Sequence, residues 1–327
     1  MTQSEVRGGT LVPVLLRGLC DDAAMFPPGE APPVEAVPAH RVHRAAWYAP
    51  LVGPFLVGAA QLAPLAEEVP WTRPGSVPAQ GAVLVVPRGP RGLRAALGTA
   101  AEVLPGAGFE LVGVELACGP DGTPAEAARE AAEALDALLP PGVGGVVEVR
   151  RTAPGPNSGE GTGEGTPDVG RTGSELDGAL DVLAATPYRA KLRTGGLTAA
   201  AFPGTGELAG FVSGCVDRGL PFKCTAGLHH AVRHTDPATG FAHHGFTNIL
   251  AATHAALGGA TRARLADILE CRSGTELAAD LRTLTGDQAA AVRAAFTGYG
   301  TCSIAEPLAE LAELGLITLP SAHLESV

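Results

Sequence analysis

Short apolar runs alternate along the chain with longer, alanine-rich amphipathic stretches, and this alternation constrains the fold most strongly. Short apolar runs bounded by turn residues are typical of buried strands, whereas apolar residues spaced three and four apart indicate helices. The expected strands are Leu11–Leu16, Leu51–Val57, Ala82–Val86, Leu111–Leu116, Gly145–Val149, Ala190–Arg193, Pro221–Thr225 and Gly300–Ile304. Strands that alternate with helices favour a parallel sheet of the α/β class.

Helical patterns fill most of the intervals between these strands. The clearest begins at Thr123 and Pro124, with Glu126 in the first turn and alanine and leucine side chains along one face. Residues 258–298 add helical sequence before the last strand. The other expected helices are Leu93–Leu104, Leu176–Ala184, Glu207–Asp217, Gly245–Leu257 and Glu306–Leu314.

Eight expected strands predict a (β/α)8 barrel of the TIM type, formed by residues 1–327 as a single domain. A doubly wound open sheet is the alternative. Neither GxGxxG after the first strand nor GxxxxGK[ST] anywhere occurs, so the two strongest nucleotide-binding patterns are missing. Residues 152–175 are rich in Gly, Pro, Ser, Thr and Glu, which predicts a flexible insertion in the domain, either a surface loop or an active-site lid.

Composition excludes several classes of protein. The 327 residues carry a formal net charge of −11, which argues against a nucleic-acid binder. No apolar run reaches the length of a membrane span, which argues against a membrane partner. The six cysteines are scattered without a CxxC pair, which predicts reduced thiols and a cytoplasmic protein. A homo-oligomer is compatible with the sequence.

Lysine is almost absent: of 23 basic residues only Lys191 and Lys223 are lysines, and both fall inside expected strands. A charge in a buried strand is costly without a partner, and arginine cannot replace lysine where a nucleophilic amine is needed. The pair therefore indicates catalysis or substrate contact. The alternative is a structural pair left by an arginine-rich coding bias, with one lysine salt-bridged to Glu115 or Glu148.

The segments KLRTGG, from Lys191, and FKCTAG, around Lys223, resemble class I aldolases of the deoxyribose-phosphate aldolase type. The resemblance covers residues 188–230. It implies a Schiff-base lysine on the sixth barrel strand, a second lysine on the seventh, and a Gly-rich phosphate loop after the second. The sequence departs from that pattern at Arg193 and in the two histidines that follow the second lysine. The segments DDAAMFPP, KLRTGG, FKCTAGLHH, HGFTN and GTCSIAEP also resemble a family of uncharacterised bacterial and plant proteins, which implies no particular activity.

The carboxyl ends of barrel strands and the loops after them carry functional groups in this fold. The candidate catalytic residues are Lys191, Lys223, His229, His230, Glu148 and Asp21. The candidate substrate-binding residues are Arg193, Arg150, Arg88, Thr194, Gly195, Gly196, Thr225, Gly227 and Ser303. The arginines would hold an anion in a bidentate manner, and the Gly-rich turns would present backbone N–H groups to it. Structural salt bridges to Glu115 and Glu148 are the alternative for the arginines.

Histidines cluster after the second lysine, and such clusters can bind zinc or another divalent metal. The candidate ligands are His229, His230 and His244, although their spacing matches no dedicated metal motif. The same histidines could act as general acids or bases beside Lys223. Cys224 and Cys302 are further candidate nucleophiles, since a neighbouring Lys or His activates a thiol.

These residues predict an enzyme of the lyase class, with lysine-assisted carbonyl chemistry of the aldolase type on a small anionic substrate and no cofactor. One lysine would form a Schiff base or stabilise an enolate, and the other would lower its pKa. One alternative is a metal-dependent lyase or hydrolase that uses the histidine cluster. The other is a non-catalytic barrel that binds a small ligand.

Overall fold

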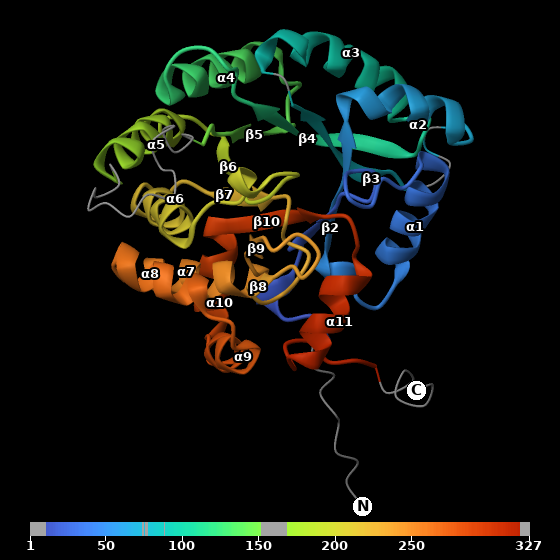
Figure 1. The fold of residues 1–327 in the computed structure, drawn as a ribbon. Helices are drawn as coiled ribbons and strands as arrows, with labels where there is room; N and C mark the ends of the chain where they lie inside the picture. The colour runs from blue at the N-terminus through green and yellow to red at the C-terminus, as the bar shows by residue number, and fades with distance from the viewer. Residues whose placement is uncertain (1–10, 74, 76–77, 88, 152–168, 321–327) are drawn as a thin grey trace, which may run out of the picture.

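A closed barrel of eight parallel strands forms the centre of the computed structural model, which describes residues 11–73, 75, 78–87, 89–151 and 169–320 (Figure 1). The strand order around the barrel is β1-β10-β7-β6-β5-β4-β3-β2. This confirms the predicted α/β barrel and excludes the open sheet. The barrel strands are β1 (Cys20–Asp22), β2 (Val52–Gly58), β3 (Gln80–Val86), β4 (Phe109–Ala117), β5 (Gly144–Glu148), β6 (Arg189–Arg193), β7 (Phe222–Thr225) and β10 (Phe296–Thr301).

Helices surround the barrel as an outer ring (Figure 1). They are α1 (Pro33–Ala45), α2 (Leu62–Glu68), α3 (Leu93–Val103), α4 (Pro124–Leu138), α5 (Val169–Ala184), α6 (Thr205–Asp217), α7 (Phe246–Leu257), α8 (Arg262–Glu270), α9 (Gly274–Arg282), α10 (Gly286–Ala295) and α11 (Ala305–Glu313). Helix α4 begins as predicted, because Thr123 and Glu126 exchange hydrogen bonds in a capping box.

The barrel wall separates two kinds of core. Leu84 and Val86 of β3 belong to the large apolar cluster beneath the helices. Their neighbours Val83 and Val85 point to the opposite face, because side chains alternate along a strand, and they pack with Leu56 in a separate small cluster. The barrel interior is therefore apolar beside β2 and β3, and the buried charged side chains lie on β1, β4, β5, β6 and β7.

Three expectations at the ends of the barrel are wrong. The run Leu11–Leu16 is not a strand: Val14–Leu16 form a 3-10 turn, and the first strand is β1, six to nine residues later in the sequence than expected. Asp21 and Asp22 consequently lie within a strand and not after one. The last strand, expected at Gly300–Ile304, is Phe296–Thr301.

Two further segments bear on the sequence predictions. An unpredicted hairpin of β8 (His234–Thr235) and β9 (Ala242–His243) follows β7. The predicted insertion 152–175 overlaps helix α5, which begins at Val169, and residues 152–168 lie outside the described residues. Within the described ranges, no helix is long and apolar enough to cross a membrane.

Candidate active site

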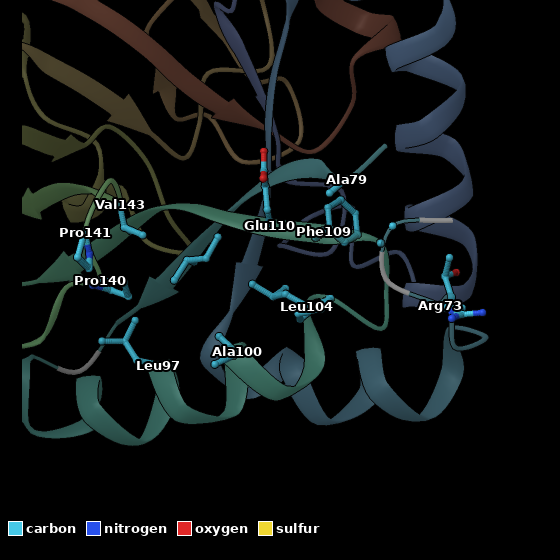
Figure 2. Close-up of a pocket in the computed structure, with 16 residues that line it drawn as sticks. Arg73, Ala79, Leu97, Ala100, Leu104, Phe109, Glu110, Pro140, Pro141 and Val143 are labelled. Carbon is cyan, nitrogen blue, oxygen red and sulfur yellow. The ribbon is translucent and has the colours of Figure 1, made fainter. Parts of the chain in front are cut away.

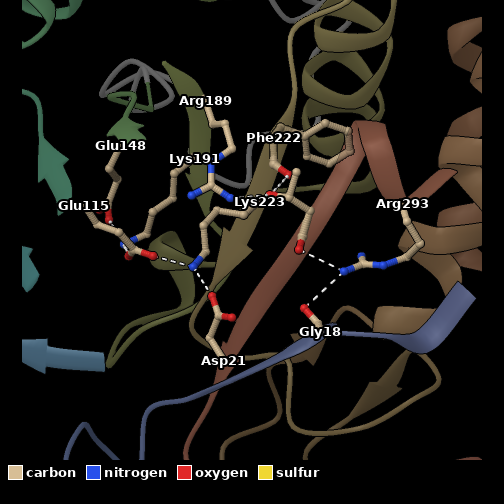
Figure 3. A network of polar contacts seen from close by, with 10 residues as sticks. Gly18, Asp21, Glu115, Glu148, Arg189, Lys191, Phe222, Lys223 and Arg293 are labelled. Carbon is tan, nitrogen blue, oxygen red and sulfur yellow. Dashed lines mark hydrogen bonds and ion pairs between the residues drawn. The ribbon is translucent and has the colours of Figure 1, made fainter. Parts of the chain in front are cut away.

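Lys191 on β6 and Lys223 on β7 lie opposite each other in the strand register, and one carboxylate joins them. Lys191 Nζ lies 2.5 Å from Oε2 of Glu115 on β4, and Lys223 donates to the other oxygen, Oε1 (Figure 3). Both lysines are buried, with 2% and 3% of their side chains exposed. The sequence prediction that the lysines share a site agrees with this geometry.

The shared carboxylate is the middle of a longer chain of charges. Glu148 Oε2 lies 2.9 Å from Lys191 Nζ, and its Oε1 accepts a hydrogen bond of 3.2 Å from Arg193 Nε. At the other end, Lys223 also donates to Asp21 of β1. Six groups thus alternate in sign, in the order Arg193, Glu148, Lys191, Glu115, Lys223 and Asp21. We call this set the charge chain.

The charge chain runs from solvent into the barrel. The exposed fraction of the side chain falls from 47% at Arg193 to 16% at Glu148 and 1% at Glu115. Arg193 is the last residue of β6, so the exposed end lies at the carboxyl-terminal mouth, where barrels carry their functional groups. A small anion that approaches this mouth meets Arg193 first.

The carboxylates outweigh burial at both lysines. Burial alone would lower the pKa of Lys191, but Glu115 and Glu148 raise it to about 12. The pKa of Lys223 is likewise raised, since Asp21 and Glu115 outweigh its burial and the nearby Lys191. Lys191 does lower the pKa of Lys223, as expected, but neither lysine has a lowered pKa in the resting site, because each ammonium has two carboxylate partners.

The pKa values of the three carboxyl groups are shifted in different directions. Burial would raise the pKa of Glu115, but the two lysines lower it to about 2, and the pKa of Glu148 is also lowered by Lys191 and Arg193 against its burial. Burial raises the pKa of Asp21, and Lys223 offsets this only in part. Asp21 is therefore the one carboxylate of the charge chain whose pKa lies above its ordinary value.

Gly53 on β2 makes room for the Asp21 carboxylate. A Cβ atom at position 53 would lie 2.1 Å from Asp21 Oδ1, far inside van der Waals contact. The register of β1 and β2 shifts at this point, which is the mark of a bulge. Asp22, the next residue, points to the other face of β1, where it lies 2.8 Å from Nδ1 of His40. Of the two aspartates, only Asp21 belongs to the charge chain.

The two Gly-rich turns after β6 and β7 pack directly against each other. A Cβ atom on Gly195 would lie 2.7 Å from Gly227 Cα, so only glycine permits this approach. The Thr194 hydroxyl donates to the carbonyls of Thr225 and Ala226 and is buried. Gly227 and Ala226 both have positive φ, and Gly196 is exposed. The two turns therefore pack together as one unit at the carboxyl-terminal mouth of the barrel, next to Arg193.

The remaining predicted anion contacts have different surroundings. The guanidinium of Arg150 donates to the carbonyls of residues 119–122, so it holds the loop after β4. Ser303 lies after β10, where its hydroxyl accepts from the Glu306 N–H at the start of α11. Arg88 lies outside the described residues. Their roles toward a substrate stay predictions.

The structure separates the predicted histidines. His229 Nδ1 lies 3.4 Å from Cys302 Sγ, whereas His230 contacts Glu310. His244 is buried: its Nε2 lies 2.7 Å from the Pro203 carbonyl, and Arg233 donates to its Nδ1. Both ring nitrogens of His244 are therefore engaged. In the part of the chain that the structure describes, no three His, Cys, Asp or Glu side chains are placed to hold a metal ion, and the proposed zinc ligands are not brought together.

Two residues of the site were not among the candidate site residues. Glu115 was expected as a salt-bridge partner of one lysine, and it joins both. Gly53 carried no signal, because a glycine next to a proline in a strand reads as an ordinary bulge. An acidic residue in the middle of the apolar run Leu111–Leu116 was the available sign for Glu115.

Two cavities lie away from the charge chain, near the amino ends of the strands. One of about 520 Å³ lies between α3 and the amino end of β4, with Leu97, Leu104 and Phe109 in its apolar lining (Figure 2). The other, of about 290 Å³, is lined by His40, Arg44 and Gly53, among others. The first has no contact with charge-chain residues, and the second meets the chain only where Gly53 adjoins Asp21.

The fold and the site together define a parallel α/β barrel of the TIM type with a lysine–carboxylate chain in its interior. No family model matches the chain, and comparison with curated proteins and with solved structures finds no significant match. The class therefore rests on the geometry of this chain.

Proposed function

We propose that the protein is an enzyme that performs lysine-assisted carbonyl chemistry, of the aldolase or lyase type, on a small anionic carbonyl compound. The observation that carries this proposal is the pair of buried lysines joined by Glu115, in a charge chain that reaches solvent at Arg193. A TIM barrel commonly supports an enzyme, and the carboxyl-terminal mouth is its usual active site.

Lys223 is the amine that attacks the carbonyl in this proposal. It has Asp21 as a neighbour, and Asp21 is the carboxylate of the chain whose pKa is raised. A proton moves from the Lys223 ammonium to Asp21, and the neutral amine then forms a C–N bond with the carbonyl carbon. The nitrogen passes one proton to the carbinolamine oxygen, and Asp21 returns to this oxygen the proton that it took from Lys223. The oxygen then leaves as water, which gives the protonated imine.

Lys191 stays a cation throughout. Its two carboxylate partners have lowered pKa values and are poor proton acceptors, so they hold the ammonium form. A fixed positive charge there would stabilise negative charge on the substrate oxygen or on an enolate. The aldolase resemblance would place the Schiff base on the sixth strand instead, and the Asp21 contact favours the seventh.

Arg193 and the turn at Gly196 are the groups that would bind the substrate at the carboxyl-terminal mouth. Arg193 is half exposed and uses only part of its guanidinium on Glu148, so it can also grip a carboxylate or phosphate. The exposed turn at Gly196 lies beside it and offers backbone N–H groups. Both features favour a substrate with an anionic group.

Borohydride trapping tests the proposal. Wild-type protein is incubated with a panel of short phosphorylated and carboxylated aldehydes and ketones, and the mass of the intact protein is measured after reduction. We expect one substrate-sized increase in mass with at least one anionic carbonyl compound and a smaller increase with its uncharged analogue. No adduct across the panel would sink the imine mechanism.

Complete pairing of the charge chain favours a second candidate, a barrel that binds a ligand without chemistry, in which the lysines only close the interior. In that case anionic carbonyl compounds and their alcohol analogues would bind equally well in calorimetry. The enzyme proposal expects the carbonyl compound to bind more tightly, because only it can form the covalent bond.

A further inference from the structure

A thiol and an imidazole face each other at the carboxyl-terminal mouth, outside the charge chain. Cys302 directly follows β10, and His229 ends the turn after the neighbouring strand β7. The Sγ and Nδ1 atoms lie 3.4 Å apart, and Cys302 is half-buried.

The surroundings of this pair set its protonation. Burial raises the pKa of Cys302, and Glu306 and Asp22 add to this, whereas hydrogen bonding from the backbone of Gly29 and Cys302 itself acts against it. Burial lowers the pKa of His229, with Glu306 opposing and His230 and His234 reinforcing the effect. At neutral pH the pair is therefore a thiol beside a neutral imidazole, which is the arrangement that general-base catalysis requires.

We propose that Cys302 and His229 form a second nucleophilic site, which takes small aldehydes as a reversible hemithioacetal. Cys302 Sγ bonds to the aldehyde carbon while its proton passes to His229 Nδ1. The carbonyl π bond opens, and the imidazolium returns the proton to the new alkoxide oxygen. Atoms and charges balance with no oxidant or leaving group.

The other cysteines provide internal comparison. Cys20, Cys215 and Cys224 are buried. Cys271 is half-buried like Cys302, but its sulfur contacts the Ser273 carbonyl and Glu276, and neither is a neutral base. Cys271 therefore reports the reactivity of a similarly placed thiol without an imidazole.

Alkylation by iodoacetamide, followed peptide by peptide in the full-length protein, tests the pair. Cys302 should react faster than Cys271 at pH 7, with a rate that rises with pH through a pKa below 6.5 and then levels off. His229→Gln should slow Cys302 on the order of 10²-fold, the usual contribution of a general base. His230→Gln is the matched control: it changes the adjacent imidazole, which contacts Glu310, and removes one of the groups that lower the pKa of His229, so it should move the pH midpoint of Cys302 alkylation upward and leave the plateau rate unchanged.

Glycolaldehyde supplies the second measurement. It should slow the alkylation of Cys302 but not of Cys271, and dilution should restore the original rate. Equal Cys302 rates in wild type and His229→Gln, or no protection by the aldehyde, would overturn the proposal. This experiment measures alkylation of the Cys302 peptide without borohydride, whereas the imine is measured as a reduced adduct on lysine peptides. Either proposal can therefore fail while the other stands.

Discussion

Each charged side chain of the charge chain is stabilised by a neighbour of opposite charge. Three cations and three anions alternate, so each buried charge has an opposite neighbour and the set is neutral. Removing one partner of a buried ion pair leaves an uncompensated charge and typically costs about 3–5 kcal/mol. Conservative changes that shift one member without deleting its charge are therefore the more informative probes of function.

Gly53→Ala is such a probe. The new methyl group overlaps Asp21 Oδ1, so the carboxylate must leave the position in which its Oδ2 accepts from Lys223. We expect a loss of about 1–3 kcal/mol in the free energy of unfolding, as for other overpacked sites. Imine formation should slow at the same time, because the proton acceptor for Lys223 is displaced.

Gly92→Ala is the matched control, since a Cβ atom there meets no atom within 4 Å. The free energy of unfolding in urea and the rate of borohydride trapping are measured for both variants. If Gly53→Ala traps carbonyl compounds as fast as Gly92→Ala does, Asp21 is not the proton acceptor.

At the scale of elements, the paired turns after β6 and β7 set the shape of the mouth. Gly195 and Gly227 allow the two backbones to touch, and the buried Thr194 hydroxyl fastens one turn to the other. This contact fixes the exposed end of the charge chain, because Arg193 immediately precedes the first turn.

Gly195→Ala should separate the turns, since the new methyl group would meet backbone atoms that cannot rotate away. We expect about 1–3 kcal/mol of destabilisation and weaker binding of anionic carbonyl compounds. Gly206→Ala, on the exposed face of α6 with open space around it, should change stability by only about 0.5 kcal/mol or less. Denaturant titration compares the two, and equal stabilities would show that the turns are not in tight contact.

Periodicity predicted the interior elements well and the ends of the barrel poorly. Strands β2 to β5 carry apolar runs, and the positions of β2 to β7 were predicted to within a few residues. Strand β1 has the sequence Cys-Asp-Asp, whose two carboxylates are tolerated because Lys223 and His40 lie on its opposite faces. Strand β10 contains two glycines and no apolar alternation. Tertiary partners, which a single sequence does not display, specify both strands.

The same limit applies to the site. The scarcity of lysine indicated Lys191 and Lys223, and strand alternation placed them near each other. The pKa values of the two lysines are raised by carboxylates on β1, β4 and β5, and these strands are far in the sequence from the lysines they contact. Whether a buried lysine is activated or neutralised is decided by such long-range contacts.

At the scale of the whole molecule, buried ionisable groups set the pH range of stability. Burial lowers the pKa of His244 from 6.5 to about 4, so the unfolded chain binds a proton that the native protein excludes. Stability is therefore lost as pH falls from about 6.5 to 4. Because the pKa of Glu115 is lowered in the native protein, further stability is lost as the pH falls from about 4.5 to 2. The raised pKa of Lys191 acts at high pH, where stability is lost only as the pH rises above about 10.5.

His244→Gln should flatten the first of these intervals. Glutamine can still donate to the Pro203 carbonyl but does not titrate, so the acid-induced loss of up to about 3 kcal/mol should shrink between pH 6.5 and 4. Below pH 4 wild type and variant should lose stability in parallel. Urea unfolding at a series of pH values checks this, and identical slopes above pH 4 would contradict it.

The central claim is that Lys223 is the reacting amine of the charge chain. The most direct measurement is peptide mass spectrometry of wild-type protein after borohydride trapping with the anionic carbonyl compound that gives the strongest adduct. We expect the reduced adduct on the peptide that contains Lys223, with Lys191 unmodified. An adduct on Lys191, or on the α-amino group alone, would contradict it.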